Sequence, residues 1–94
     1  MKGFLSFLIL WIISKRSMTG VEIAFELEKR KGRRLSPGTI YPVLKNLKDK
    51  DLLSIDENKS YSLTKRGRDE LENRLKMFFK IFSDIDEMRT YYKK

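Results

Sequence analysis

Residues 36–47 read SPGTIYPVLKNL, a stretch that combines the apolar spacing of a helix with two prolines and a glycine. Its apolar residues recur at i, i+3, i+4 and i+7, the spacing of one helical face: Ile40, Val43, Leu44 and Leu47. Ser36 is a favoured N-cap residue, and Pro37 suits the first helical position, where no N–H is needed. We therefore predict a helix that begins at Pro37, buries one face and leaves the other face polar, with Tyr41, Lys45 and Lys48 opposite the apolar residues.

Pro42 falls in the second turn of this helix, where its ring removes the hydrogen bond to the Gly38 carbonyl and crowds that carbonyl. Gly38 has no Cβ, so the backbone has room to adjust. We infer that the loosened turn brings backbone N–H groups and the hydroxyls of Ser36 and Thr39 close to a phosphate, because a helix N-terminus attracts negative charge. The alternative is a turn that only ends one helix and starts the next.

The segment before this helix predicts another one. Thr19 and Glu22 form the pattern T-x-x-E, the capping box that satisfies two free backbone donors at a helix start. Gly32 marks the end of this second helix, and Arg33 and Arg34 lead from it to residue 36. Two helices with a short connection indicate a helix-turn-helix.

Residues 4–13 are apolar apart from Ser6 and at first suggest a secretory signal. No cleavage site of the usual kind follows, and the run is shorter than the roughly 20 residues that cross a bilayer. We predict instead a first helix that is apolar nearly all round and is covered on several sides. Trp11 is then expected to be a core residue rather than one that stacks on a ligand.

The pattern changes to that of strands after residue 50. Residues 52–55 are β-prone, 56–59 form a polar turn and 60–63 alternate, which together predict a two-stranded hairpin. Thr64 can cap a long last helix whose apolar residues recur at heptad spacing: Leu71, Leu75, Phe78, Phe82, Ile85 and Tyr92. The predicted fold is mostly α with a small β-hairpin, in the order of a winged helix-turn-helix. Residues 1–64 would form the DNA-binding domain, and residues 65–94 a dimerisation helix of the same compact unit.

The composition limits the class of protein. The chain has 94 residues, enough for one domain, and it contains neither cysteine nor histidine. Disulfides, the common zinc sites and the usual proton relays are thereby excluded. We expect a cytoplasmic protein that is not an enzyme and that uses no metal or cofactor.

The formal net charge of +8 is concentrated in the middle of the chain. Residues 29–50 hold eight basic residues against Asp49 alone, whereas residues 1–28 are balanced and residues 51–94 carry an excess of one. Such a concentration indicates a surface for a polyanion. The alternative is a solvated face on a protein that is merely basic.

Two stretches closely resemble the PadR family of transcriptional regulators: SPGTIYPVLKNLKDKDLL at 36–53 and YSLTKRG at 61–67. The resemblance runs from about Leu8 to Leu71. It departs at Val21, where tyrosine is common, and at Asp51, where the turn usually has a glycine with positive φ. The last helix also lacks the tryptophan that stacks on ligands in the drug-binding branch. The resemblance implies a winged helix whose third helix enters the DNA major groove.

The predicted DNA contacts divide by role. Phosphate contacts are expected from Arg33, Arg34, Lys59, Lys65 and Arg66. Lys45 and Lys48 are the candidates for reading base edges, guanine O6 and N7 especially. The remaining contacts are expected at the start of the helix, from Ser36, Thr39, Tyr41 and Pro42.

The last helix has more apolar surface than one small domain covers, which indicates an interface. Packing it against the first helix and a symmetry mate would give a two-fold dimer with recognition helices about 34 Å apart. The residues expected at this interface are Phe4, Leu8, Trp11, Leu71, Leu75, Phe78, Phe79, Phe82, Ile85 and Tyr92. The alternative is a monomer whose last helix folds back on its own core.

The sequence thus predicts a homodimeric regulator of transcription, a repressor, that binds a pseudo-palindromic operator in double-stranded DNA. A small apolar effector between the two phenylalanine-rich helices is left open. Two other functions compete with this one. A winged-helix protein-interaction module would be favoured by an acidic recognition face, and the face is basic. A protein that docks on the membrane surface would use the apolar N-terminus, but it leaves the pattern of residues 36–47 unexplained.

Overall fold

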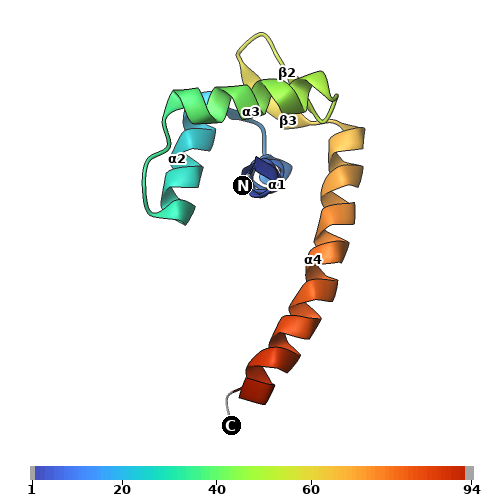
Figure 1. Cartoon of the computed structure of the whole chain (residues 1–94). Helices are drawn as coiled ribbons and strands as arrows, with labels where there is room; N and C mark the ends of the chain where they lie inside the picture. The colour runs from blue at the N-terminus through green and yellow to red at the C-terminus, as the bar shows by residue number, and fades with distance from the viewer. Residues whose placement is uncertain (1, 93–94) are drawn as a thin grey trace.

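Four helices and three short strands make up the chain in this computed structural model, which describes residues 2–92 (Figure 1). In chain order they are α1 (Lys2–Lys15), β1 (Met18–Thr19), α2 (Gly20–Lys31), α3 (Pro37–Asp49), β2 (Leu53–Ile55), β3 (Ser60–Leu63) and α4 (Lys65–Tyr92). The order confirms the predicted winged helix-turn-helix. The helix-turn-helix is α2 with α3, and the wing is the hairpin of β2 and β3.

The core forms around α1, because this helix is apolar on nearly every side. It contacts α2, α3, α4 and β3, and Figure 1 shows it end-on between α2 and α4. Ile9 and Leu10 have no exposed surface. Full burial of such a side chain stabilises the fold by about 1.5–3 kcal/mol. The rest of the core comes from α1 itself, the other three helices, the sheet and the turn before β2: Leu5, Ile12, Ile13, Met18, Ile23, Leu27, Ile40, Leu44, Leu47, Leu52, Leu53 and Leu71.

Trp11 is not part of this core. Its side chain is 37% exposed, and the Lys15 ammonium lies 5.0 Å from the centre of its ring. The expectation of a core tryptophan is therefore wrong for the single chain. Phe4 and Trp11 lie on one side of α1, and both side chains remain more than one-third exposed. The other elements therefore do not fully cover this side of α1.

Local hydrogen bonds fix where α2 and α3 begin and end. The predicted capping box is confirmed: Thr19 Oγ1 accepts from the Glu22 N–H at 3.2 Å, and Glu22 Oε1 accepts from the Thr19 N–H at 2.9 Å. Gly32 ends α2 at a φ of 74°, the left-handed conformation that glycine adopts without a Cβ clash. Ser36 occupies the N-cap position of α3, but its hydroxyl makes no capping hydrogen bond.

The sheet has three strands rather than the predicted two. The strand order is β1-β3-β2, all antiparallel, with Met18 opposite Tyr61 and Leu53 opposite Leu63. The additional strand, β1, has two residues and is too short to show an alternating pattern in the sequence. Asp51 leads into β2 at a φ of 61°, as expected for a position where glycine is usual.

A close backbone contact seats the start of α4 against the turn before β2. Thr64 Oγ1 accepts from the Gly67 N–H at 2.9 Å, which confirms Thr64 as the cap, and donates to the Asp51 carbonyl at 2.6 Å. A Cβ on Gly67 would collide with the Leu52 carbonyl oxygen. Only glycine allows the two segments to approach this closely.

Only the first half of α4 packs on the rest of the chain. Leu71 is buried, the rings of Phe7 and Phe78 lie 4.6 Å apart, and Arg74 donates to the Gly3 carbonyl at 3.3 Å. The helix has 28 residues, and its second half extends well beyond the other elements (Figure 1). From Met77 onward α4 exposes large apolar side chains: Met77, Phe79, Ile81, Phe82, Ile85, Met88 and Tyr91.

Candidate nucleic-acid interface

The buried side of α3 determines which of its side chains face outward. Ile40, Leu44 and Leu47 are buried, and at 3.6 residues per turn the side chains farthest from them are Pro42, Lys45, Asn46 and Asp49. All four are exposed. Tyr41 and Lys48 are also exposed, but they lie about a quarter turn from the buried side rather than opposite it. The outer face of α3 is therefore centred on Lys45 and Asp49.

Tyr41 links the recognition helix to α2. A Cβ on Gly20 would lie 2.5 Å from the Tyr41 hydroxyl oxygen, so the ring rests where only a glycine leaves room. Tyr61 on β3 is also nearby: burial first, and the Tyr41 phenol second, raise the pKa of Tyr61 above its ordinary value. Tyr41 is still 45% exposed, which leaves part of the ring free for a contact outside the protein.

The N-terminal turn of α3 is open to solvent. Ser36 and Thr39 are exposed, and their hydroxyl oxygens lie 3.1 Å apart. The Ser36 carbonyl accepts from the Thr39 N–H at 3.0 Å and from the Ile40 N–H at 3.2 Å. Two hydroxyls thus stand together at the start of a helix, where the partial positive charge of the helix favours an anion. Pro42 lies one turn further along the same helix.

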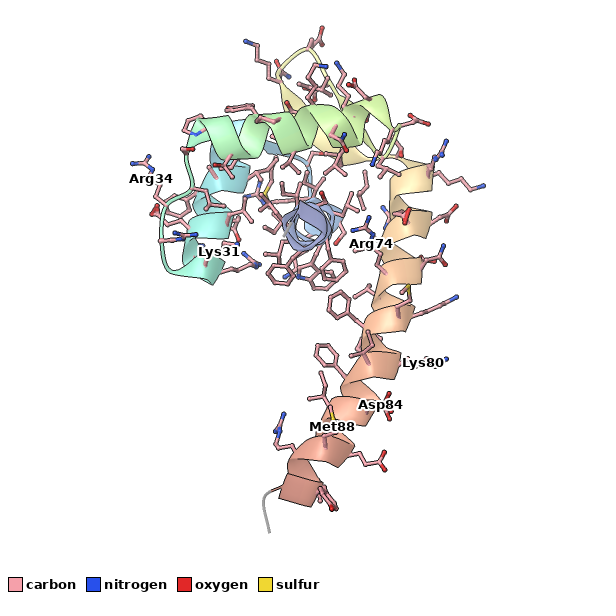
Figure 2. All side chains as sticks on the ribbon, in the orientation of Figure 1. Lys31, Arg34, Arg74, Lys80, Asp84 and Met88 are labelled. Carbon is pink, nitrogen blue, oxygen red and sulfur yellow. The ribbon has the colours of Figure 1, made fainter. Side chains whose placement is uncertain are left out.

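Arg33 and Arg34 lie in the exposed connection between α2 and α3. Figure 2 shows Arg34 pointing away from the body of the molecule at the end where α3 begins. Arg34 also borders an open hollow of about 540 Å³ that runs between α2 and the start of α3, past Phe25 and Tyr41. Positive charge therefore stands beside the exposed turn of Ser36 and Thr39.

The tip of the wing is held by one aspartate. Asp56 Oδ1 accepts from the N–H groups of Asn58 and Ser60, at 2.9 and 3.0 Å, and the Asp56 carbonyl accepts from the Lys59 N–H at 3.0 Å. Lys59 has a φ of 62°, a conformation that costs a residue with a Cβ about 1–2 kcal/mol. Its side chain is exposed at the tip.

Lys65 and Arg66 are exposed in the first turn of α4. Arg66 borders a small hollow with Asp49 and Lys50, so it stands at the C-terminal end of α3. Arg33 and Arg34 stand at the other end of the same helix. The predicted phosphate contacts are therefore not gathered in one patch but are spread along α3, about 18 Å for a helix of 13 residues.

Two exposed residues of α3 escaped the sequence prediction. Asn46 is exposed and borders a hollow that Gly3 and Arg74 also line, and a side-chain amide is suited to read adenine. Asp49 pairs with Lys45, with Asp49 Oδ2 at 3.2 Å from Lys45 Nζ. The sequence contained the signal for both residues, because the spacing of the apolar residues places Asn46 and Asp49 on the polar side of the helix.

A small winged helix with an exposed, basic recognition helix defines a DNA-binding regulator of transcription. The chain belongs to the transcriptional regulator PadR-like family, whose sequence profile matches residues 9–73. Members of this family are transcription regulators and not enzymes, as the sequence predicted. No curated protein matches the sequence closely enough to add a more specific relative.

The chain is also similar to solved structures of PadR-like regulators. The chain is 25% identical to a PadR-like transcription factor from Bacteroides fragilis, with a TM-score of 0.81 over 93% of this chain and 91% of that one. It is 27% identical to a PadR-like transcriptional regulator from Bacillus cereus, with a TM-score of 0.79 over 93% and 92%. It is 30% identical to Bacillus subtilis PadR, solved in complex with p-coumaric acid, with a TM-score of 0.69 over 76% of this chain and 43% of that one.

The apolar start of the chain does not make a membrane span. Among the described residues, no helix combines the length and the apolar character needed to cross a bilayer.

Proposed function

We propose that this protein is a repressor that binds specific sequences of double-stranded DNA as a homodimer. The observation that carries the proposal is the exposed basic and polar surface formed by α3, the connection before it and the wing. The wing tip and the outer side of α3 project from the same end of the molecule (Figure 1). One duplex can therefore meet both.

In the proposed complex α3 lies in the major groove. Lys45, Lys48 and Asn46 are the side chains offered to base edges, because all three are exposed on α3. Tyr41 lies against the sugar-phosphate wall or a thymine methyl group. The hydroxyls of Ser36 and Thr39, with the start of the helix, approach a phosphate.

Arg33, Arg34, Lys59, Lys65 and Arg66 supply the remaining phosphate contacts. Each neutralised phosphate releases counterions, so the logarithm of the binding constant falls with the logarithm of salt concentration by about 0.9 per contact. Five contacts predict a slope of about −4 to −5 for each protomer. This term gives affinity for any sequence, and the base contacts add the preference.

The proposed dimer is supported by the apolar surface that the chain leaves uncovered. Phe4 and Trp11 on α1 and Phe82 and Ile85 on α4 remain 36–49% exposed, and they belong to two helices that contact each other. Figure 2 shows Lys80 and Asp84 on the side of α4 turned away from the rest of the chain. A second copy packed against the other side would cover the apolar residues and leave the charges in water.

The predicted interface residues do not contribute alike. Leu71 is 4% exposed and packs in the core of its own chain, so it has no surface to offer to a partner. Leu8, Leu75 and Phe78 are partly buried within the chain, whereas Phe79 is 66% exposed. The side chain of Tyr92 lies outside the described residues.

A two-fold dimer places two recognition helices about 34 Å apart, which matches two half-sites of a pseudo-palindromic operator. A dimer seated there would cover promoter DNA and exclude other proteins from it, which is the physical basis for proposing repression. We also propose that the protein acts in the cytoplasm. An apolar effector would bind between the exposed rings of α1 and α4, where Trp11, the sole tryptophan, would report it by fluorescence.

The direct test measures fluorescence anisotropy of a labelled duplex of mixed sequence in about 50 and about 200 mM salt. We expect binding that weakens steeply with salt, and a double variant Arg33→Gln and Arg34→Gln that binds less tightly with a shallower slope. The matched control is Lys76→Gln with Lys80→Gln, which removes the same charge from exposed positions on α4 and should bind like the wild type.

Failure to bind any duplex at the lower salt concentration would refute the proposal. Anionic vesicles serve as the competing surface in the same assay. If vesicles displace the duplex from the protein, the membrane-surface function gains support and the regulatory one loses it. Binding of duplex that vesicles leave unchanged supports the proposed function.

A further inference from the structure

Asp49 is the only acidic residue in the most basic segment of the chain. Residues 29–50 hold eight lysines and arginines against this one carboxylate. It is the last residue of α3, and it belongs to the outer face of the helix, opposite the buried Ile40. A negative charge is thus placed on the face proposed to enter a groove lined by phosphates.

The stability of α3 does not explain this placement. The C-terminus of a helix carries partial negative charge, so an aspartate there is less favourable than a lysine or arginine. Asp49 pairs with Lys45 at 3.2 Å in the order lysine then acid, which stabilises a helix less than the reverse order. The side chains of Lys45 and Asp49 are 78% and 61% exposed, and ion pairs in water contribute little to stability.

We propose that Asp49 is a specificity-determining residue that positions Lys45 for base readout and weakens binding to the wrong sequence. The inference rests on the proposed DNA-binding function and names how the recognition helix discriminates. Asp49 holds the Lys45 ammonium over the outer face of α3. The ammonium is therefore less free to swing toward the nearest phosphate.

The pair makes the cost of entering a groove depend on its sequence. Inside the groove the Lys45 ammonium and the Asp49 carboxylate lose their hydrogen bonds to water. Binding is favourable only where new hydrogen bonds to the bases replace them. A guanine accepts from Lys45 at O6 or N7, and a cytosine donates from its N4 amino group to Asp49. Where these edges are absent, the carboxylate faces phosphates and acceptor edges, and the complex is disfavoured.

Other charges beside Asp49 do not replace this role. Lys50 and Arg66 border the same small hollow, together with Glu70, and lie toward α4. Among the described residues, Lys45 is the group that pairs with Asp49. Removing the carboxylate therefore releases Lys45 in particular.

The test first selects a preferred duplex from a random pool with the wild-type protein and then compares this duplex with a scrambled one. We expect Asp49→Asn to bind the scrambled duplex more tightly at about 0.1 M salt, by about fivefold to tenfold for each protomer, because Lys45 gains one phosphate contact in each. Its salt slope on that duplex should steepen by about 0.9 per protomer. Affinity for the selected duplex should rise less or fall, so that the specificity ratio drops at least about fivefold.

Two further variants separate this effect from net charge and from structure. Asp49→Glu keeps a carboxylate one turn after Lys45 and should keep the specificity ratio within about twofold of the wild type. Asp84→Asn changes the net charge by the same amount at an exposed position far along α4, and it should change neither duplex's binding (Figure 2).

A specificity ratio in Asp49→Asn equal to that of the wild type would overturn the inference while leaving the proposed function in place. Equal loss of affinity for both duplexes would do the same, because it would indicate a structural role. A wild-type protein that selects no duplex overturns both.

Discussion

Replacement of Lys59 by glycine is expected to stabilise the protein and to weaken its binding to DNA. Lys59 stands at the tip of the wing with a φ of 62°, where an L-residue with a Cβ is strained. Its N–H donates to the Asp56 carbonyl at 3.0 Å, a hydrogen bond that glycine keeps. The Lys59 ammonium is proposed to contact a phosphate, and the substitution by glycine removes this contact. One substitution thus moves stability and binding in opposite directions.

The two magnitudes follow from separate sources. Relief of the strained backbone contributes about 1–2 kcal/mol, and the greater freedom of glycine in the unfolded chain offsets about 0.5–1 kcal/mol of it. The net gain of about 1 kcal/mol raises the Tm of a domain of this size by about 4–8 °C. Loss of one phosphate contact removes about 1 kcal/mol of counterion release at 0.15 M salt, or about fivefold in Kd per wing.

The assay pairs urea unfolding followed by circular dichroism with anisotropy titrations on a labelled duplex. Lys59→Gln is the matched control, because it removes the charge and keeps the Cβ. It should lose the same DNA affinity as Lys59→Gly without the gain in stability. Equal stability of the two variants would refute backbone strain at Lys59, and DNA binding as tight as that of the wild type in both would refute its phosphate contact.

Three further substitutions test other parts of the structure. Gly67→Ala should destabilise the fold by about 1–3 kcal/mol in urea unfolding, because its Cβ meets the Leu52 carbonyl oxygen and backbone cannot yield as a side chain can; an unchanged midpoint would contradict the contact. The pKa of the Glu22 carboxylate is held below 4.5, mainly by the hydrogen bond from the Thr19 N–H and next by the hydrogen bond from the Arg16 guanidinium. The ionised carboxylate should therefore stabilise the fold above pH 4.5, and this stabilisation should be lost as the pH falls through the folded pKa. Unfolding midpoints measured from pH 3 to 7 should therefore vary less in Glu22→Gln, and an equally steep profile would exclude this carboxylate as a source. Phe82→Glu should convert the proposed dimer to monomer in light scattering at micromolar concentration, whereas Lys80→Glu, on the side of α4 turned away from the chain, should leave the mass unchanged; a dimer that survives Phe82→Glu would place the interface elsewhere.

The sequence predicted the elements that depend on local chemistry. The capping box of Thr19 and Glu22, the stop at Gly32 and the cap at Thr64 are each set by residues a few positions apart, and all three are found. The wing is likewise found where a polar turn separates two β-prone runs. Positive φ at Asp51 was implied by the family resemblance, because glycine is usual at that position.

Features that depend on contacts between distant segments were harder to predict. β1 exists because Met18 and Thr19 meet β3, and a strand of two residues has no pattern of its own. Trp11 looked like a core residue because its neighbours on α1 are apolar, but which side of α1 stays open depends on how the other helices pack around it.

The candidate interface shows the same division. The polar side of α3 could be predicted from the spacing of its apolar residues, but the close fit of Tyr41 over Gly20 joins residues 21 positions apart and has no local signal. The same apolar spacing also places Asp49 and Lys45 opposite the buried side, although the sequence prediction named Tyr41 and Lys48 there together with Lys45. The centre of the face is Lys45 with Asp49, rather than Tyr41 with Lys48.

Whether two copies of the chain read one operator together is tested by selecting bound duplexes from a random pool at a stated salt concentration and measuring the mass of the selected complex by light scattering. We expect enrichment of an inverted repeat whose half-sites are centred about 10 base pairs apart, bound by two copies of the chain. A pool that shows no enrichment, or a single unrepeated site bound by one copy, would contradict this expectation.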